Sequence, residues 1–196
     1  MTTKQSLATP IHAHRCLPSR LHHNAYVTCD QEANRVFYEE VIGLPLVATW
    51  TEVEELWGKE RVYCHTFYGL ADGSALAFFQ FADPADQALY GPKMPETPFS
   101  HIALKADEET QDAIEARLLK AGYTAPQTFS LEHGYCRSLY VRDPNGLQIE
   151  FTVDPPNVQH IDAVQRQSAR AELARWLGGD HTSNNNYRHI GRLAKP

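Results

Sequence analysis

The sequence predicts an α+β fold in which two βαβββ modules are followed by a C-terminal helix. Three observations lead to this prediction. Short segments have the apolar and aromatic content of strands, two further segments show helical spacing directly after an aspartate, and the same order of elements occurs twice. The repeat is about 70 residues long and is visible in the order of elements rather than in sequence identity.

The first module is expected at residues 21–83. Its opening strand covers 21–29, Asp30 can cap the helix that follows, and Gly43 can end that helix. Asp72-Gly73 provides a turn between the last two strands. The three strands after the helix are expected at 44–50, 61–69 and 75–81.

Residues 84–98 contain several prolines and are expected to be a linker, because proline interrupts helices and central strands. The second module is expected at 99–155, with a strand at 99–106 and a helix between Asp107 and Gly122. The three strands after that helix are expected around 124–128, 138–142 and 146–153, the last two joined by Asp143-Pro144-Asn145-Gly146.

The two modules together define an expected domain at residues 21–155. Residues 1–20 show no periodicity and are interpreted as an N-terminal arm. Residues 156–196 are expected to form a helix and a polar tail. The apolar residues of that helix, at 159–176, need a partner surface on the domain or on a second subunit, because an isolated helix of this length is marginal in water.

The overall composition excludes some classes of function. The chain has 196 residues and a formal net charge of −6, with scattered Lys and Arg, so nucleic acid is not an expected partner. No apolar run approaches the roughly 20 residues that span a bilayer, and no signal peptide is expected. The four cysteines are widely spaced without a CxxC pair, which favours a reduced, cytoplasmic setting.

Two histidines occupy matching places in the repeat. His23 lies in the opening strand of the first module, His101 lies in that of the second, and Glu150 lies in an apolar closing strand. Two imidazoles and one carboxylate can hold one face of an octahedral Fe(II) ion and leave the other face open. A single strand histidine is more often structural. His22 is the rival of His23, and strand alternation favours an outward position for it.

Three motifs carry a resemblance to a known family. The first runs from His23 through Asp30 to Gly43, the second is Ser100-His101-Ile102-Ala103-Leu104, and the third is Asp143-Pro144-Asn145-Gly146 followed by Leu147 to Glu150. This pattern resembles the vicinal oxygen chelate superfamily over about residues 20–155. The superfamily includes glyoxalase I, extradiol dioxygenases, fosfomycin-modifying enzymes and bleomycin-binding proteins. The resemblance implies that the paired modules curl around a metal-bearing cleft.

Within that group, the stretch from His133 to Glu150 is similar to the signature of single-domain extradiol ring-cleavage dioxygenases, and Leu131 departs from it. By resemblance, Glu150 is the carboxylate ligand, Tyr140 hydrogen-bonds a substrate oxygen, and His133 lies just behind it. The structural alternatives are a packing aromatic for Tyr140 and a turn residue for His133.

Two features depart from relatives. Extradiol enzymes usually carry an acid–base histidine near the position of Ser74; here the nearest candidate is His65, which is equally well explained as a packed strand residue. Glyoxalases use a fourth carboxylate ligand in the strand at 75–81, where this chain has only Gln80 as a weak substitute.

The resemblance therefore implies an Fe(II) extradiol-type dioxygenase, an oxidoreductase of aromatic compound catabolism, acting on a catechol-like or hydroquinone-like molecule with dioxygen. Mn(II) or Zn(II) are alternative metals. The alternative functions are a metal-dependent glyoxalase-like lyase or isomerase, and a drug-binding resistance protein. The expected state is a homodimer or a higher homo-oligomer.

Overall fold

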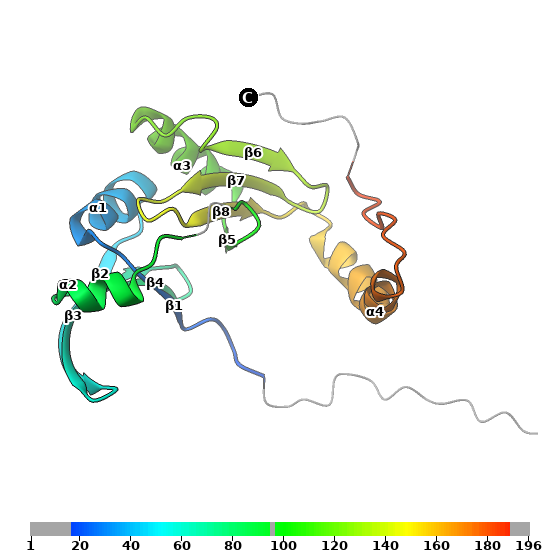
Figure 1. The fold of residues 1–196 in the computed structure, drawn as a ribbon. Coiled ribbons are helices and arrows are strands. Elements are labelled where there is room, and N and C mark those ends of the chain that lie inside the picture. The colour runs from blue at the N-terminus through cyan, green and yellow to red at the C-terminus, as the bar shows by residue number, and fades with distance from the viewer. Residues whose placement is uncertain (1–16, 95–96, 189–196) are drawn as a thin grey trace, which may run out of the picture.

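The structure, a computed structural model, describes residues 17–94 and 97–188 and contains two four-stranded sheets (Figure 1). The first module consists of β1 (His23–Val27), α1 (Gln31–Arg35) continued by the π-helix η2 (Val36–Ile42), β2 (Leu46–Leu56), β3 (Lys59–Gly69), β4 (Ala75–Phe81) and α2 (Pro84–Tyr90). The second module consists of β5 (His101–Lys105), α3 (Glu108–Lys120), β6 (Phe129–Glu132), β7 (Arg137–Arg142) and β8 (Gln148–Val153). The last described helix is α4 (Val158–Leu177).

The strand order is the same in the two modules. The first sheet runs β1-β4-β3-β2 and the second runs β5-β8-β7-β6. In each sheet the opening strand pairs in parallel with the closing strand, and the remaining neighbours are antiparallel. The predicted α+β fold of two βαβββ modules with a C-terminal helix is confirmed.

The helix caps explain why the two modules follow the same path. The Asp30 carboxylate accepts a hydrogen bond from the Ala33 backbone N–H at 2.9 Å, and Asp107 accepts one from Thr110 at 2.8 Å. Each cap satisfies a backbone donor that the first helical turn leaves free. Gly43 has a φ of 93°, a left-handed conformation that ends η2 at little cost.

Three expected elements are corrected. The first half of the expected linker is the helix α2, because Pro84 sits in the first turn, where no N–H is needed, and Asp83 caps it. The strand expected around 124–128 lies instead at Phe129–Glu132, since Pro126 cannot donate a ladder hydrogen bond there. β2 is longer than expected and extends to Leu56, because it pairs with β3 along a hairpin on which Glu54 and Glu55 are exposed.

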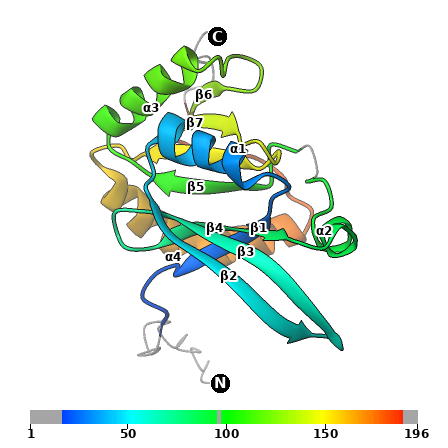
Figure 2. The same cartoon turned by 90° about the vertical axis from the view of Figure 1, so that its left-hand side faces the viewer.

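One core joins the two modules. The buried Tyr38 of η2 donates a hydrogen bond from its hydroxyl to Asp143 Oδ2 at 2.8 Å, across to the second module. α1 and α3 both lie toward the viewer in Figure 2, and η2 contacts α3. The core cluster of buried side chains includes Phe37, Tyr38, Tyr68, Leu76 and Phe78 from the first module and Leu118, Leu139, Val141 and Ile149 from the second.

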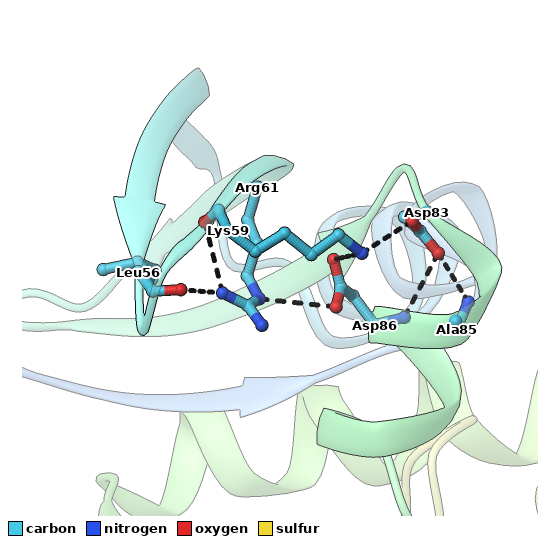
Figure 3. Close-up of polar contacts among 6 residues, drawn as sticks. All are labelled: Leu56, Lys59, Arg61, Asp83, Ala85 and Asp86. Atoms are coloured by element: carbon cyan, nitrogen blue, oxygen red, sulfur yellow. Dashed lines mark hydrogen bonds and ion pairs between the residues drawn. The ribbon is translucent and has the colours of Figure 1, made fainter.

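The β2–β3 hairpin is anchored by a buried ion pair (Figure 3). Arg61 and Asp86 are 7% and 4% exposed, and Arg61 Nε lies 3.3 Å from Asp86 Oδ1. Lys59 Nζ donates to both Asp86 and Asp83. The Arg61 guanidinium also donates to the carbonyl of Leu56. Helix α2 therefore holds the end of a hairpin that projects beyond the rest of its sheet (Figure 2).

Helix α4 packs on the domain only near its start. Ile161 is buried, whereas Val164, Leu173 and Trp176 are 39%, 59% and 56% exposed. Packing of these exposed residues on a second subunit stays a prediction. The expected N-terminal arm lies mostly outside the described residues. None of the described helices is long and apolar enough to cross a membrane.

Candidate metal centre

The second module brings two of the three predicted ligands together. His101 on β5 and Glu150 on β8 lie on neighbouring parallel strands, and His101 Nε2 is 2.8 Å from Glu150 Oε2. Glu150 is 5% exposed, so its carboxylate is costly without a partner. His101 Nδ1 lies 3.0 Å from the carbonyl oxygen of Pro98. A proton shared with that carbonyl directs Nε2 toward Glu150, which is the usual arrangement of a metal-binding imidazole.

Tyr140 and His133 extend this pair into a polar network. Tyr140 on β7 is the direct cross-strand partner of Glu150, and its hydroxyl lies 3.1 Å from His133 Nε2. The Tyr140 ring stacks on Phe129 with 4.9 Å between centroids and lies 5.9 Å from the ring of His101. Burial raises the pKa of Tyr140, and the neighbouring Glu150 carboxylate raises it further. The phenol is therefore a protonated hydrogen-bond donor at neutral pH.

A cavity of about 540 Å³ contains this network. His101, His133, Tyr140 and Glu150 all line it. Apolar walls come from Phe99, Phe129 and Leu131, among others. The second module thus combines an apolar cavity with a few convergent polar groups, as ligand sites generally do.

The first module places His23 in an aromatic environment. The His23 ring lies 5.5 Å from the ring of Phe67 and 6.2 Å from that of His65. His65 stacks on Phe79 with 3.7 Å between centroids, and no described group hydrogen-bonds its buried Nε2. Burial lowers the pKa of His65, and the positive charge that His23 can carry lowers it further. His23 also lines a separate cavity of about 480 Å³.

The outward position inferred for His22 is wrong. β1 begins only at His23, so the alternation of strand side chains does not apply to His22. The Nδ1 atoms of the two rings lie 2.8 Å apart, and both residues line the same cavity. His22 is therefore a neighbour that can orient the His23 ring.

The three predicted ligands do not converge within one chain. Among residues 17–94 and 97–188, no three His, Cys, Asp or Glu side chains are grouped closely enough to hold a metal. The physical reason is the topology: β1 is an edge strand of one sheet, β5 is an edge strand of the other, and the modules join through their helices instead. Within the described part of one chain the three residues form no grouped site, and their assignment as ligands of one metal ion stays a prediction.

Strand β4 contributes no fourth carboxylate. The side chain of Gln80 donates to the carbonyl of Cys29 and accepts from the N–H of Gln31, so it is engaged near the start of α1. Phe79, its neighbour, points to the opposite face, where it meets His65. The described strand therefore offers aromatic surface rather than a ligand on the His23 side.

Sequence reasoning missed the aromatic and backbone supports of the site. Phe79 and Phe129 hold the rings of His65 and Tyr140, and the carbonyl of Pro98 positions His101. The only signal for the two phenylalanines was their place in strands beside the candidate residues. Pro98 gave no signal, because a backbone carbonyl is present at every residue.

The family model described as the Glyoxalase/Bleomycin resistance protein/Dioxygenase superfamily matches residues 20–151. The chain belongs to this superfamily. The match includes His23, His101 and Glu150, and it ends before α4.

Individual known proteins are similar to the chain in sequence or in fold. The uncharacterized protein YwbC of Bacillus subtilis is 29% identical over 141 residues, which are 69% of this chain and 98% of YwbC. A superfamily domain from Frankia sp. has a TM-score of 0.52 at 16% identity, covering 74% of this chain and 99% of that one. The fosfomycin resistance protein FosX of Listeria monocytogenes has a TM-score of 0.52 at 16% identity, covering 72% and 98%.

Proposed function

We propose that the protein is a non-haem Fe(II) dioxygenase that cleaves a catechol-like or hydroquinone-like ring in the extradiol manner. In this proposal two copies of the chain complete each site. One copy contributes His23, and the other contributes His101 and Glu150. The observation that carries the proposal is the connected network of His101, Glu150, Tyr140 and His133 inside one cavity.

The residues present fit a divalent cation. Glu150 is a buried carboxylate at 2.8 Å from an imidazole nitrogen whose ring is held from its other side by the Pro98 carbonyl. Two imidazoles and one carboxylate suit Fe(II), with Mn(II) and Zn(II) as alternatives. β1 and β5 each have an edge that no described strand pairs with, and this supports completion by a second copy, because an edge strand offers backbone groups for pairing.

When bound by His23, His101 and Glu150, Fe(II) would supply the redox chemistry that couples a catechol to dioxygen. In extradiol cleavage the ring carbon–carbon bond beside one hydroxylated carbon breaks. Both oxygen atoms of dioxygen enter the product, and the catechol provides the electrons. The absence of a carboxylate on β4 that faces His23 is consistent with this need for open positions.

Tyr140 and His133 act on substrate oxygen and its proton. The Tyr140 hydroxyl is a donor beside Glu150, so it can hydrogen-bond a substrate oxygen at the cavity wall. His133 Nε2 is 3.1 Å from that hydroxyl and can exchange a proton with it. The stacking of Tyr140 on Phe129 restricts the ring, which keeps the hydroxyl positioned.

His65 is proposed as the base that helps remove a substrate proton. Its Nε2 has no hydrogen-bond partner among the described residues, and stacking on Phe79 fixes its ring. Because it lies beside His23, it would enter the site from the same copy as that ligand.

The test is oxygen consumption by protein purified without oxygen and loaded with Fe(II). With a panel of catechols and hydroquinones, the proposal expects oxygen uptake together with a yellow ring-fission product. Fully iron-loaded protein that consumes no oxygen with any of them would contradict the dioxygenase. Air-independent turnover by a Zn(II) or Mn(II) protein would favour a lyase or isomerase instead.

A further inference from the structure

A second cavity, of about 440 Å³, adjoins the one that contains Glu150. Its walls come from the β6–β7 turn, the end of β8, α4 and the residues after α4. Tyr135, Cys136 and Thr152 line both cavities, so the two share a wall. The family match ends at residue 151, and α4 and the residues after it are therefore additions of this chain to the family domain.

Residues 180–188, here called the strap, are seated on the turn that carries His133. Asn185 Nδ2 donates to the His133 carbonyl at 3.1 Å. Asn185 Oδ1 in turn accepts from the backbone N–H groups of Tyr187 and Arg188, both at 3.1 Å. Gly134 is the point of closest approach, because a Cβ there would lie 2.1 Å from the carbonyl oxygen of Tyr187.

Strand β8 lines both cavities. Glu150 and Thr152 are two residues apart and lie on one face of the strand, about 6.6 Å from each other. Asp154 follows at the same interval just after the strand and lines the second cavity. Thr152 Oγ1 is buried and has no hydrogen-bond partner among the described residues. A short substituent on a ring held near Glu150 would pass this hydroxyl.

The charges in the second cavity favour a cation. Asp154 and Asp162 both line it, and no Lys or Arg is among its described lining residues. Lys105, which does not line the cavity, is paired with Asp154 at 2.5 Å and also acts electrostatically on Asp162, so one cation faces two carboxylates. Arg188, at the end of the strap, acts electrostatically on Tyr135 and does not itself line the cavity.

We propose that the second cavity is a substrate subsite, closed by the strap, that receives a short substituent ending in an amine. The inference rests on the proposed function, because it requires that the catechol ring binds beside Glu150. It adds the substrate class: catechols with a cationic side chain, selected by Asp162 and by Thr152 in the wall that the two cavities share.

The test compares the affinities of three catechols that differ only in the end of the side chain. The probes are 4-ethylcatechol, dopamine and 3,4-dihydroxyphenylacetate, titrated calorimetrically into iron-loaded protein without oxygen. Dopamine is expected to bind about tenfold more tightly than 4-ethylcatechol, and the carboxylate is expected to bind most weakly. If the three catechols bind with equal affinity, the proposed subsite is refuted, while the proposed binding of the ring beside Glu150 still holds. No binding by any of them overturns the proposed function and the subsite with it.

Two glycines give a matched control for the strap. Gly134→Ala and Gly122→Ala impose the same left-handed strain, since their φ values are 83° and 87°, but a Cβ at Gly122 meets nothing within 4 Å. Gly134→Ala is expected to displace the strap and abolish the preference for dopamine, while Gly122→Ala keeps it. Asp162→Asn alters an exposed side chain, so the fold should stay intact. It should reduce the preference for dopamine over 4-ethylcatechol about tenfold. Retention of the preference in both Gly134→Ala and Asp162→Asn would contradict the proposal.

Discussion

The two modules have the same strand order and the same aspartate caps, yet their sheets present different chemistry. The second module carries a buried carboxylate, a phenol and two imidazoles in one hydrogen-bonded cavity. The first carries His23 and His65 on an aromatic surface of Phe67 and Phe79. Neither module holds a complete set of metal ligands among the described residues.

This difference indicates that the repeat preserves the fold of the module but not the chemistry of its side chains. The fold depends on caps, turns and apolar alternation, which both modules keep. The chemistry depends on a few side chains, which each half can change separately. A polar half and an aromatic half are complementary, and the proposed site uses both.

The largest expected effect is a loss of metal from the second module, which carries the polar network. Glu150→Ala should remove most of the bound metal, lowering affinity by more than the roughly 10–100-fold that is typical of residues that only orient a ligand. Glu132→Ala is the control, because Glu132 is exposed and only accepts a hydrogen bond from the Gly134 backbone. Elemental analysis of the two purified variants measures the effect. Equal metal retention would refute Glu150 as a ligand.

A smaller effect compares one acid–base candidate from each half. Tyr140→Phe removes only a hydroxyl and should lower turnover about 100-fold at unchanged metal content. His65→Ala should lower turnover by a similar factor if the aromatic half supplies the base. Oxygen uptake and iron content are measured on the same samples. Wild-type turnover in both variants would refute the proposed roles of Tyr140 and His65 in catalysis but would not contradict the metal site.

The hairpin of the first module gives a test of stability rather than chemistry. Asp86→Ala leaves the buried Arg61 without its carboxylate and should lower the free energy of unfolding by about 3–5 kcal/mol. Asp83→Ala removes the cap of α2 and a half-exposed partner of Lys59, and it should cost less, about 1–2 kcal/mol. Denaturant unfolding compares the two. Equal losses would mean that the Arg61–Asp86 pair does not anchor the hairpin.

Much of the fold was predictable because its signals are local. Asp30 and Asp107 predict where two helices begin, and the turn at 143–146 predicts the last hairpin. Helix α2 was missed because its proline, which is favourable in a first turn, was taken as a breaker. The His101–Glu150 pair followed from motif and strand position. The separation of His23 from it depends on how edge strands of two sheets are placed, which no local pattern encodes.

Metal binding by mixed subunits tests most directly whether two copies share each metal site. His23→Ala and Glu150→Ala, prepared separately, should each lose metal. Mixing them through reversible dissociation or co-expression should restore about a quarter of the wild-type content, because random pairing makes about half of the dimers mixed, each with one intact site. Recovery to that level is expected if two copies share each site. A mixture that holds no more metal than the separate variants would contradict a site shared between two copies.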